Sequence, residues 1–413
     1  MAEESRISDK RDAVARHETA MSGTGPQQPD QPIVLVFVSH FFPGYRAGGP
    51  PRAIANLIDQ VSGVMFKILT ADRDMGDSQP YKNVPANKWL EHGGAQVFYT
   101  ERATLRLRNL CKLIRQTECS ALYLNGLFDR LTIRVLLLRW LKLIPVKPVI
   151  LAPRGVFSRG AINLKRWKKI AYLTVSRLMG LYRGIVWHST SGSESEDLRA
   201  WFRGYINLVD LPDIPRPPAA SAPENHVAKL PGKLRIVFLS RISPMKNLLQ
   251  AVELTSKLNH ETLFDIYGPI EDTQYWQACQ KLIANAPSNV RIKYCREVRP
   301  EEIGRIMGQY DVMLLPTLGE NYGHVIVEAL ASATPVLISE NTPWRGLQAQ
   351  HAGWDLPLSE PASIVACLEQ LAMMVEGEHR CWRDGAYKLA CAHVCSEDTA
   401  LGYRNLFSMV SKP

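Results

Sequence analysis

Residues 311–336 read DVMLLPTLGENYGHVIVEALASATPV. The apolar run at 311–316 ends in proline, a turn with glycine follows, and an apolar stretch begins at His324, which predicts a strand, a tight turn and a helix. The first backbone N–H groups of a helix have no partner within it, so such a turn is suited to bind an anion. Glu320 enters the turn and Glu328 lies eight positions later. This spacing lets one acid meet the front of a ligand and the other its flank.

Short apolar runs recur along the rest of the chain and alternate with longer mixed segments. Two of these longer segments, 52–60 and 164–181, have helical patterns. The alternation predicts a mostly parallel, doubly wound sheet in each half of the chain. Strands are expected at 33–39, 64–70, 96–99, 121–124, 149–152 and 185–188, and again at 235–240, 263–267, 290–294, 312–315 and 335–339.

A proline-rich segment, residues 209–232, separates the two α/β regions. It contains six prolines and has the composition of an interdomain linker. An N-terminal domain is therefore expected at 32–208 and a C-terminal domain at 233–398, followed by a final helix at 399–413. Residues 1–31 are polar and charged and lack the apolar centre of a signal peptide, so they are expected to form a disordered leader.

The net charge of +9 is distributed unevenly. Residues 32–210 carry a balance of +14, whereas residues 1–31 and 211–413 carry −2 and −3. The basic charge therefore belongs to the first of the two domains. It indicates a negatively charged partner: anionic lipid, a pyrophosphate-linked acceptor or nucleic acid.

No apolar run reaches the length of a transmembrane helix, because cations interrupt the most apolar stretch, 131–153. Any contact with a membrane is therefore expected to be peripheral, on its inner face. Eight cysteines are scattered without a secretory signal before them, which predicts reduced thiols and a cytoplasmic protein. The cluster of Cys381, Cys391, His393 and Cys395 fits no common zinc spacing and is expected to be ordinary helix.

The segment around the two acids resembles the EX7E signature of retaining glycosyltransferase family 4, whose members build, among other products, bacterial surface polysaccharides. The proline that ends the strand, the glycine in the turn and the Glu-Ala-Leu at 328–330 carry the resemblance, which extends over about residues 33–408. It implies a GT-B fold, in which two doubly wound, Rossmann-like domains face each other across a cleft and the last helix returns to the first domain. By this resemblance, Glu328 would bind the nucleotide ribose. The family usually has a glycine in the turn at 331–335, where this chain has Ala333. The donor sugar would be held by Glu320 and the backbone of Asn321, Tyr322, Gly323 and His324.

Two cations are expected to bind the diphosphate of the donor. The strand at 235–240 delivers Arg241 at its end, and Lys246 follows five residues later. Negative charge grows on the leaving diphosphate, so either a metal ion or fixed cations must stabilise it. The pair resembles the Arg…Lys clamp of family 4, and no Asp-x-Asp motif stands in a comparable place. No metal and no other cofactor is therefore expected.

Four further segments are expected to contribute from the first domain. Gly48 and Gly49 follow the first strand, in a loop that family 4 places beside the donor phosphates or the acceptor. Arg154, in the Ala-Pro-Arg-Gly segment, is the best candidate for a polar residue on the acceptor side. Asn125 stands where many members carry a histidine that faces the sugar, and His188 closes another strand.

The helical pattern at 164–181 places apolar side chains on one face and cations at its start. Cations at a helix N-terminus oppose the helix dipole. Two interpretations are equally open: the cations bind a phosphate-bearing acceptor or an anionic lipid, or they form a basic face exposed to solvent. The apolar face comprises Leu164, Trp167, Ala171, Val175 and Leu178, and the cations are Lys165, Arg166, Lys168 and Lys169.

Taken together, these features predict an enzyme that transfers a sugar, with retention, from a nucleoside-diphosphate sugar to a hydroxyl of a polysaccharide or lipid-linked oligosaccharide precursor. Retention follows from the resemblance alone. A nucleotide-sugar epimerase can share the fold, but no acid–base pair stands out for elimination and re-addition. A basic nucleic-acid-binding protein is a further alternative, although aromatic residues are not interleaved with the cations in the pattern that base stacking requires.

Overall fold

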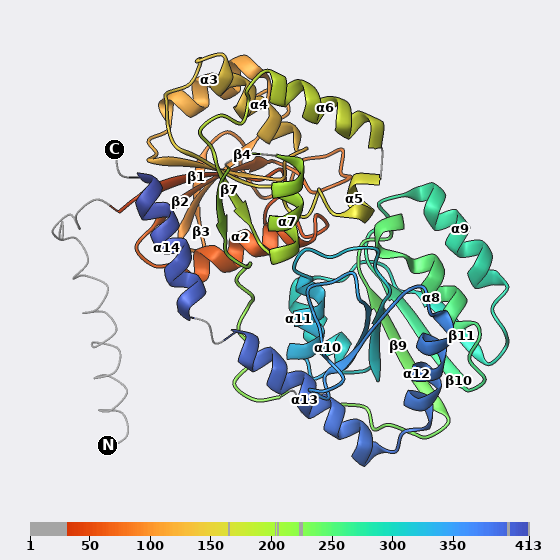
Figure 1. The fold of residues 1–413 in the computed structure, drawn as a ribbon. Helices are drawn as coiled ribbons and strands as arrows, with labels where there is room; N and C mark the ends of the chain where they lie inside the picture. Colours follow the sequence, from red (N-terminus) through yellow and green to blue (C-terminus); the bar gives the residue numbers. More distant parts are fainter. Residues whose placement is uncertain are drawn as a thin grey trace, which may run out of the picture. The chain divides into compact units, whose positions relative to one another are not determined.

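The computed structural model describes residues 31–163, 166–202, 204, 206–222, 226–394 and 397–411. The leader predicted at residues 1–31 lies outside this part of the chain, except for Gln31. The positions of Leu164, Lys165 and Cys395 are also outside it. Both sheets belong to the compact unit Pro32–Pro413 (Figure 1).

The first domain contains an eight-stranded sheet in the order β3-β4-β2-β1-β5-β6-β7-β8. Every neighbouring pair is parallel except β3 with β4. The central strands are continuous runs of buried apolar residues, which is typical of parallel sheets covered on both faces. The strands are β1 (Ile33–Phe37), β2 (Met65–Ala71), β3 (Trp89–His92), β4 (Ala95–Thr100), β5 (Ala121–Asn125), β6 (Val149–Ala152), β7 (Val186–Ser189) and β8 (Asn207–Asp210).

Helices cover this sheet, and separate apolar clusters lie on its two faces. One cluster includes Leu110 of α3 and Val135 of α4, and the other includes Ile54 of α2. The helices are α2 (Gly49–Gln60), α3 (Leu107–Gln116), α4 (Arg130–Trp140), α5 (Arg159–Asn163), α6 (Arg166–Leu178) and α7 (Gly192–Trp201).

The second domain contains a six-stranded parallel sheet in the order β11-β10-β9-β12-β13-β14. Its strands are β9 (Lys233–Leu239), β10 (Glu261–Tyr267), β11 (Val290–Tyr294), β12 (Val312–Leu315), β13 (Val336–Ser339) and β14 (Gly353–Leu356). Its helices are the 3-10 turns η1 (Pro244–Lys246) and η2 (Pro300–Glu302), and α8 (Leu248–Thr255), α9 (Thr273–Ala284), α10 (Ile303–Met307), α11 (His324–Ala331), α12 (Pro361–Met373) and α13 (Glu376–Val394).

The last helix, α14 (Glu397–Ser411), follows the second domain in the chain but packs on the first (Figure 1). Tyr403, Leu406 and Phe407 are buried in the same cluster as the strands β1, β2 and β5. The ring of Phe407 lies 5.6 Å from that of Phe66, centroid to centroid. The apolar face of this helix therefore completes the core of the first domain.

All eleven predicted strands are present, and three others were not predicted. β3 is a short antiparallel edge strand, β8 ends at the start of the proline-rich segment, and β14 is another edge strand. Edge strands are buried on fewer sides and so give weaker apolar patterns. The helix expected at 164–181 is preceded by the short α5, and α6 ends at Leu178, just before Gly180 with φ 70°.

Candidate active site

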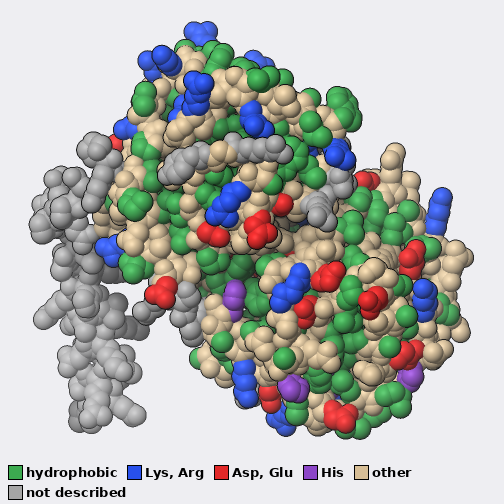
Figure 2. Space-filling view, viewed as in Figure 1, with side chains coloured by type: hydrophobic (Ala, Val, Ile, Leu, Met, Phe, Trp, Pro, Cys, Tyr) green, Lys and Arg blue, Asp and Glu red, His purple; other side chains and the backbone are tan. Residues whose placement is uncertain are grey.

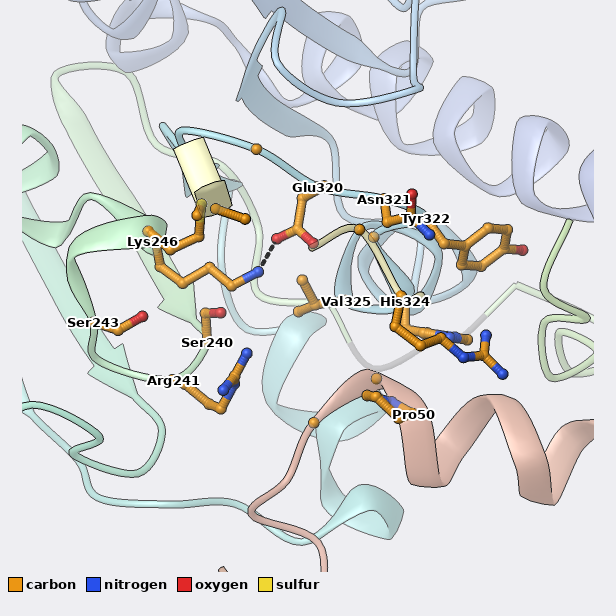
Figure 3. Close-up of a pocket in the computed structure, with 18 of the residues that line it drawn as sticks. Pro50, Ser240, Arg241, Ser243, Lys246, Glu320, Asn321, Tyr322, His324 and Val325 are labelled. Carbon is orange, nitrogen blue, oxygen red and sulfur yellow. Dashed lines mark hydrogen bonds and ion pairs between the residues drawn. The ribbon is translucent and has the colours of Figure 1, made fainter. Parts of the chain in front are cut away.

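A pocket of about 730 Å³ is lined by strand ends and loops of both domains. The second domain contributes the segments after β9, β10 and β12, and the first contributes the loop before α2 and the segment after β6 (Figure 3). Ligands of doubly wound sheets bind in this place, beyond the carboxyl ends of the strands. Of the predicted site residues, the pocket is lined by Gly48, Gly49, Arg154, Arg241, Lys246, Glu320, Asn321, Tyr322, Gly323 and His324, but not by Glu328, Asn125 or His188.

Lys246 and Glu320 form an ion pair at the centre of the pocket (Figure 3). Lys246 ends the 3-10 turn after β9, and Glu320 follows β12. The two loops are tied together because Leu318 N donates to Met245 O at 2.8 Å. The side chains are only 11% and 12% exposed, so each charge depends on the other for its partner.

Arg241 lies at the end of β9 on the same side of the pocket (Figure 3). Its side chain is one-third exposed and pairs with Glu271 at 2.9 Å. A Cβ on Gly48 would lie 3.4 Å from Arg241 Nε, so the glycine-rich loop of the first domain lies directly against this guanidinium. Gly268, just after β10, lies against the backbone of Ser240 and Arg241. Its φ is 137°, and a Cβ there would lie 1.9 Å from the carbonyl oxygen of Ser240. Only glycine fits where these two strand ends meet.

The N-terminus of α11 faces the pocket without a capping side chain. Gly323 precedes the helix with φ 82°, a left-handed conformation that L residues rarely adopt. The orphan N–H groups of the first turn give this end partial positive charge. At the other end of α11, Ala333 also adopts a left-handed conformation, with φ 51°. An alanine in this conformation carries about 1 kcal/mol of backbone strain.

Glu328 lies further along α11 and forms an ion pair with the first domain. Arg52 Nη1 donates to both of its carboxylate oxygens, at 2.6 and 2.7 Å. Arg52 itself lines the pocket, in the first turn of α2. Sequence reasoning gave Arg52 no role, although its position just after the glycine-rich loop and two prolines was a usable signal. The acid expected to bind the ribose is thus already paired with a cation.

A buried network centred on Asp213 joins the two domains. Asp213 pairs with Arg154 and, at 3.3 Å, with His324 Nε2. Burial alone would raise the pKa of Asp213, but Arg154 and His324 outweigh it and hold this pKa well below its ordinary value. Arg154 adopts a left-handed backbone conformation, with φ 66°, at the end of β6. Asp213 was missed because it lies in the segment that the sequence marks only as a linker.

Asn125 and His188 lie behind Arg154 rather than in the pocket. Asn125 is 4% exposed, and its Oδ1 accepts from Arg154 Nη2 at 2.7 Å. His188 is fully buried between the Tyr123 hydroxyl and the Leu211 carbonyl oxygen, each 2.9 Å from a ring nitrogen. Burial, with the charge of Arg154, lowers the pKa of His188 to about 4. Of these two residues suggested for the acceptor side, Asn125 contacts Arg154 directly, whereas His188 is linked to it only through the Tyr123 hydroxyl, which accepts from Arg154 Nη2 at 3.2 Å.

Asn321 reaches from the turn into the first domain. Its Nδ2 donates to Thr190 Oγ1 and, at 3.1 Å, to Glu194. Glu194 also accepts from the backbone N–H groups of Gly155 and Thr190, and burial raises its pKa. The predicted donor turn therefore contacts the first domain through a side chain as well as through the helix that follows.

The described residues contain no group of three or more His, Cys, Asp or Glu arranged to hold a metal ion. His393, from the cysteine-rich cluster, has its Nε2 3.1 Å from the Tyr322 hydroxyl, and its ring is tilted by 50° against that of Trp344, with centroids 4.5 Å apart. In the same part of the chain, no helix is long and apolar enough to cross a membrane.

The C-terminal half of the chain matches a known family. Residues 224–372 fit the model of the glycosyl transferases group 1. The matched residues lie almost wholly within the second domain. This match, together with the GT-B architecture, supports a glycosyltransferase. A comparison with curated proteins found no match to the sequence.

Solved structures share the whole architecture at low sequence identity. Sucrose-phosphate synthase from Thermosynechococcus elongatus is similar with a TM-score of 0.69 and 16% identity, over 92% of this chain and 100% of that one. Anabaena HepE, solved in complex with UDP and glucose, has a TM-score of 0.64 and 11% identity over the same shares. WaaG, a glycosyltransferase involved in lipopolysaccharide biosynthesis, has a TM-score of 0.61 and 13% identity, again over 92% and 100%. These similarities confirm the predicted GT-B fold class.

Proposed function

We propose that this protein transfers a sugar, with retention of the anomeric configuration, from a nucleoside-diphosphate sugar to a hydroxyl group. The observation that carries the proposal is the meeting of Arg241, Lys246 and Glu320 beside the uncapped N-terminus of α11 in one pocket. Two cations and a helix N-terminus suit a diphosphate, and a carboxylate beside them suits sugar hydroxyls. The pocket volume of about 730 Å³ lies in the range of small-molecule sites.

In this proposal, Arg241 and Lys246 bind the diphosphate, Glu320 and the backbone from Asn321 to His324 hold the sugar, and Glu328 binds the ribose. A donor then displaces Lys246 from Glu320, so the lysine exchanges a carboxylate for phosphate oxygens. The displaced Glu320 becomes free to accept hydrogen bonds from the sugar. Both charges keep a partner, so the exchange avoids leaving either of them unpaired inside the protein.

The reaction breaks the bond between the anomeric carbon and the diphosphate oxygen and forms a bond from the acceptor oxygen to the same carbon. The acceptor proton passes to the leaving phosphate on the same face of the sugar, so no side chain need act as nucleophile. The side chains position the reactants and stabilise the charge that grows on the diphosphate. Because Arg241 and Lys246 provide fixed positive charge at this place, we propose that transfer does not require a metal ion.

The acceptor is proposed to be a polysaccharide or lipid-linked oligosaccharide precursor in the cytoplasm. The net charge of +14 on residues 32–210 supports an acceptor that carries phosphate or lies at an anionic surface. Arg154 is the one predicted acceptor-side residue that lines the pocket. Because its guanidinium is bound by Asp213 and Asn125, we assign it the role of shaping the acceptor side rather than of binding a charge there.

The test combines donor binding with transfer. UDP-, GDP- and ADP-sugars are screened by thermal shift in the presence of a chelator, and turnover is then measured with the stabilising donor. Lys246→Ala is expected to lower turnover by about 10² to 10³, the usual loss when one group that stabilises transition-state charge is removed. Lys233→Ala is the matched control, because Lys233 forms an exposed ion pair with Glu261 far from the pocket. Near-normal turnover by folded Lys246→Ala would overturn the assignment of Lys246 to the diphosphate. Conversion of the donor without any acceptor would indicate an epimerase.

A further inference from the structure

The helix α6 turns its apolar face outward. Trp167, Val175 and Leu178 share one face in the sequence, yet their exposed fractions are 72%, 54% and 84%. The side of the helix that packs on the domain presents Leu173 and Ser176 instead. A surface helix of a globular protein ordinarily buries its apolar stripe. The reversed arrangement leaves this stripe without a partner in the described chain.

The end of α4 and the loop after it extend this apolar surface. Trp140 Nε1 donates to the carbonyl oxygen of Met179 at 2.7 Å, so the ends of α4 and α6 lie side by side (Figure 1). We name these exposed residues the α4–α6 patch: Trp140, Leu141, Leu143, Val146, Trp167, Val175, Leu178 and Met179. Eight large apolar side chains exposed on adjoining segments are more than the scattered ones that a soluble surface ordinarily carries.

Cations surround the patch. Residues 102–183 contain 18 Lys and Arg but only two acids, Glu118 and Asp129. Figure 2 shows blue side chains among green ones over the upper part of the molecule, where α3, α4 and α6 lie, and few red ones. Exposed cations on or next to these elements include Arg106, Arg108, Lys112, Lys142, Arg166, Lys168, Arg177 and Arg183.

We propose that the α4–α6 patch is the surface by which this protein docks on an anionic lipid bilayer. Apolar and tryptophan side chains enter the boundary between headgroups and acyl chains, while neighbouring Lys and Arg meet anionic headgroups. Long basic side chains can cover apolar surface and still keep their charge in the headgroup layer. A bilayer fits this charge pattern better than a protein partner, because the cations spread over three helices rather than marking one pocket.

The patch is connected to the pocket through α6 itself. Lys169, near the start of α6, lines the pocket, and Leu178 lies nine residues further along. A helix rises 1.5 Å per residue, so the two positions are about 14 Å apart along its axis. If the proposed transfer is correct, a lipid-linked acceptor held in the same bilayer would have its head group within reach of the pocket.

The test measures flotation of the full-length protein with vesicles of phosphatidylcholine alone or with about one-third phosphatidylglycerol. The wild type is expected to float with the anionic vesicles only, and less at high salt. The double variant Val146→Glu, Leu178→Glu is expected to bind about thirtyfold more weakly, since each charge placed against an anionic surface weakens binding about fivefold. Val146 and Leu178 are 95% and 84% exposed, so both changes should leave folding intact. The matched control is Leu401→Glu, Met409→Glu, which adds the same charge on exposed apolar positions of α14.

Equal vesicle binding by the two double variants would overturn the proposal, as would no binding by the wild type. Tighter binding to single-stranded RNA than to anionic vesicles, lost in the patch variant, would assign the surface to nucleic acid and overturn it as well. The assay contains no sugar donor, so its outcome is independent of the proposed transfer. Thermal stabilisation by the donor should be the same in both variants, which separates loss of docking from loss of the pocket.

Discussion

Replacing Asp213 with Asn should destabilise the protein markedly, because it leaves a buried guanidinium without its counter-charge. The side chains of Asp213 and Arg154 are each only 8% exposed. Asn keeps the shape of Asp but carries no charge, so the hydrogen bonds that Arg154 makes to Asn125 and to the Tyr123 hydroxyl are to neutral groups and do not replace the lost ion pair. His324 also loses the carboxylate that lies 3.3 Å from its Nε2.

The expected loss is about 3 to 5 kcal/mol of unfolding free energy, the range found when one partner of a buried ion pair is removed. For a domain of this size, this corresponds to a fall in Tm of roughly 6 to 20 °C. The pKa of Asp213 is lowered on folding, so its contribution is present above the unfolded pKa of about 4 and is lost as the pH falls toward the folded value. The difference between wild type and Asp213→Asn should therefore be constant above about pH 5 and shrink in more acidic solution.

Equilibrium unfolding in urea, followed by circular dichroism at several pH values, measures this difference. Glu261→Gln is the matched control, since it breaks an exposed ion pair and should cost less than about 1 kcal/mol. The double variant Arg154→Met, Asp213→Leu should be more stable than Asp213→Asn alone, because it removes both charges. A loss below about 1 kcal/mol for Asp213→Asn, or a double variant that is less stable still, would refute the reasoning.

Three further changes test other parts of the molecule. Arg52→Ala should tighten binding of the nucleotide donor several-fold in calorimetry, because the ribose then no longer competes with Arg52 for Glu328; weaker or unchanged binding would argue against this competition. Gly268→Ala should cost more than about 3 kcal/mol in urea unfolding, since its Cβ would meet a backbone oxygen at 1.9 Å, whereas Gly76→Ala, also at positive φ but in open space, should cost about 1 kcal/mol. Folding lowers the pKa of His188 to about 4, so the wild type should lose about 3 kcal/mol as the pH falls from 6.5 to 4. His188→Gln should flatten that pH dependence, and an unchanged slope would contradict the assignment.

The sequence determined the architecture because buried parallel strands have an easily recognised sequence pattern. β1, β5, β6 and β12 are almost wholly buried, and such strands read as short continuous apolar runs between helical segments. The turn between Glu320 and Glu328 was equally legible, because a glycine at positive φ and a helix start are encoded by neighbouring residues. Local rules of this kind do not depend on what packs against them.

The tertiary structure alone decided which charges meet. Lys246 and Glu320 are 74 positions apart, and Arg52 and Glu328 are 276 apart, so no local pattern could pair them. Asp213 lies in a proline-rich segment whose composition is typical of a linker, and it is buried only because both domains close around it.

The orientation of α6 was likewise settled only in three dimensions. Periodicity shows that Trp167, Val175 and Leu178 share a face, but it does not tell which face of a helix the domain covers. The amino-acid sequence shows directly only which residues are neighbours along the chain. Burial and ion pairing depend on neighbours in space, which the packing of the two sheets and their helices brings together.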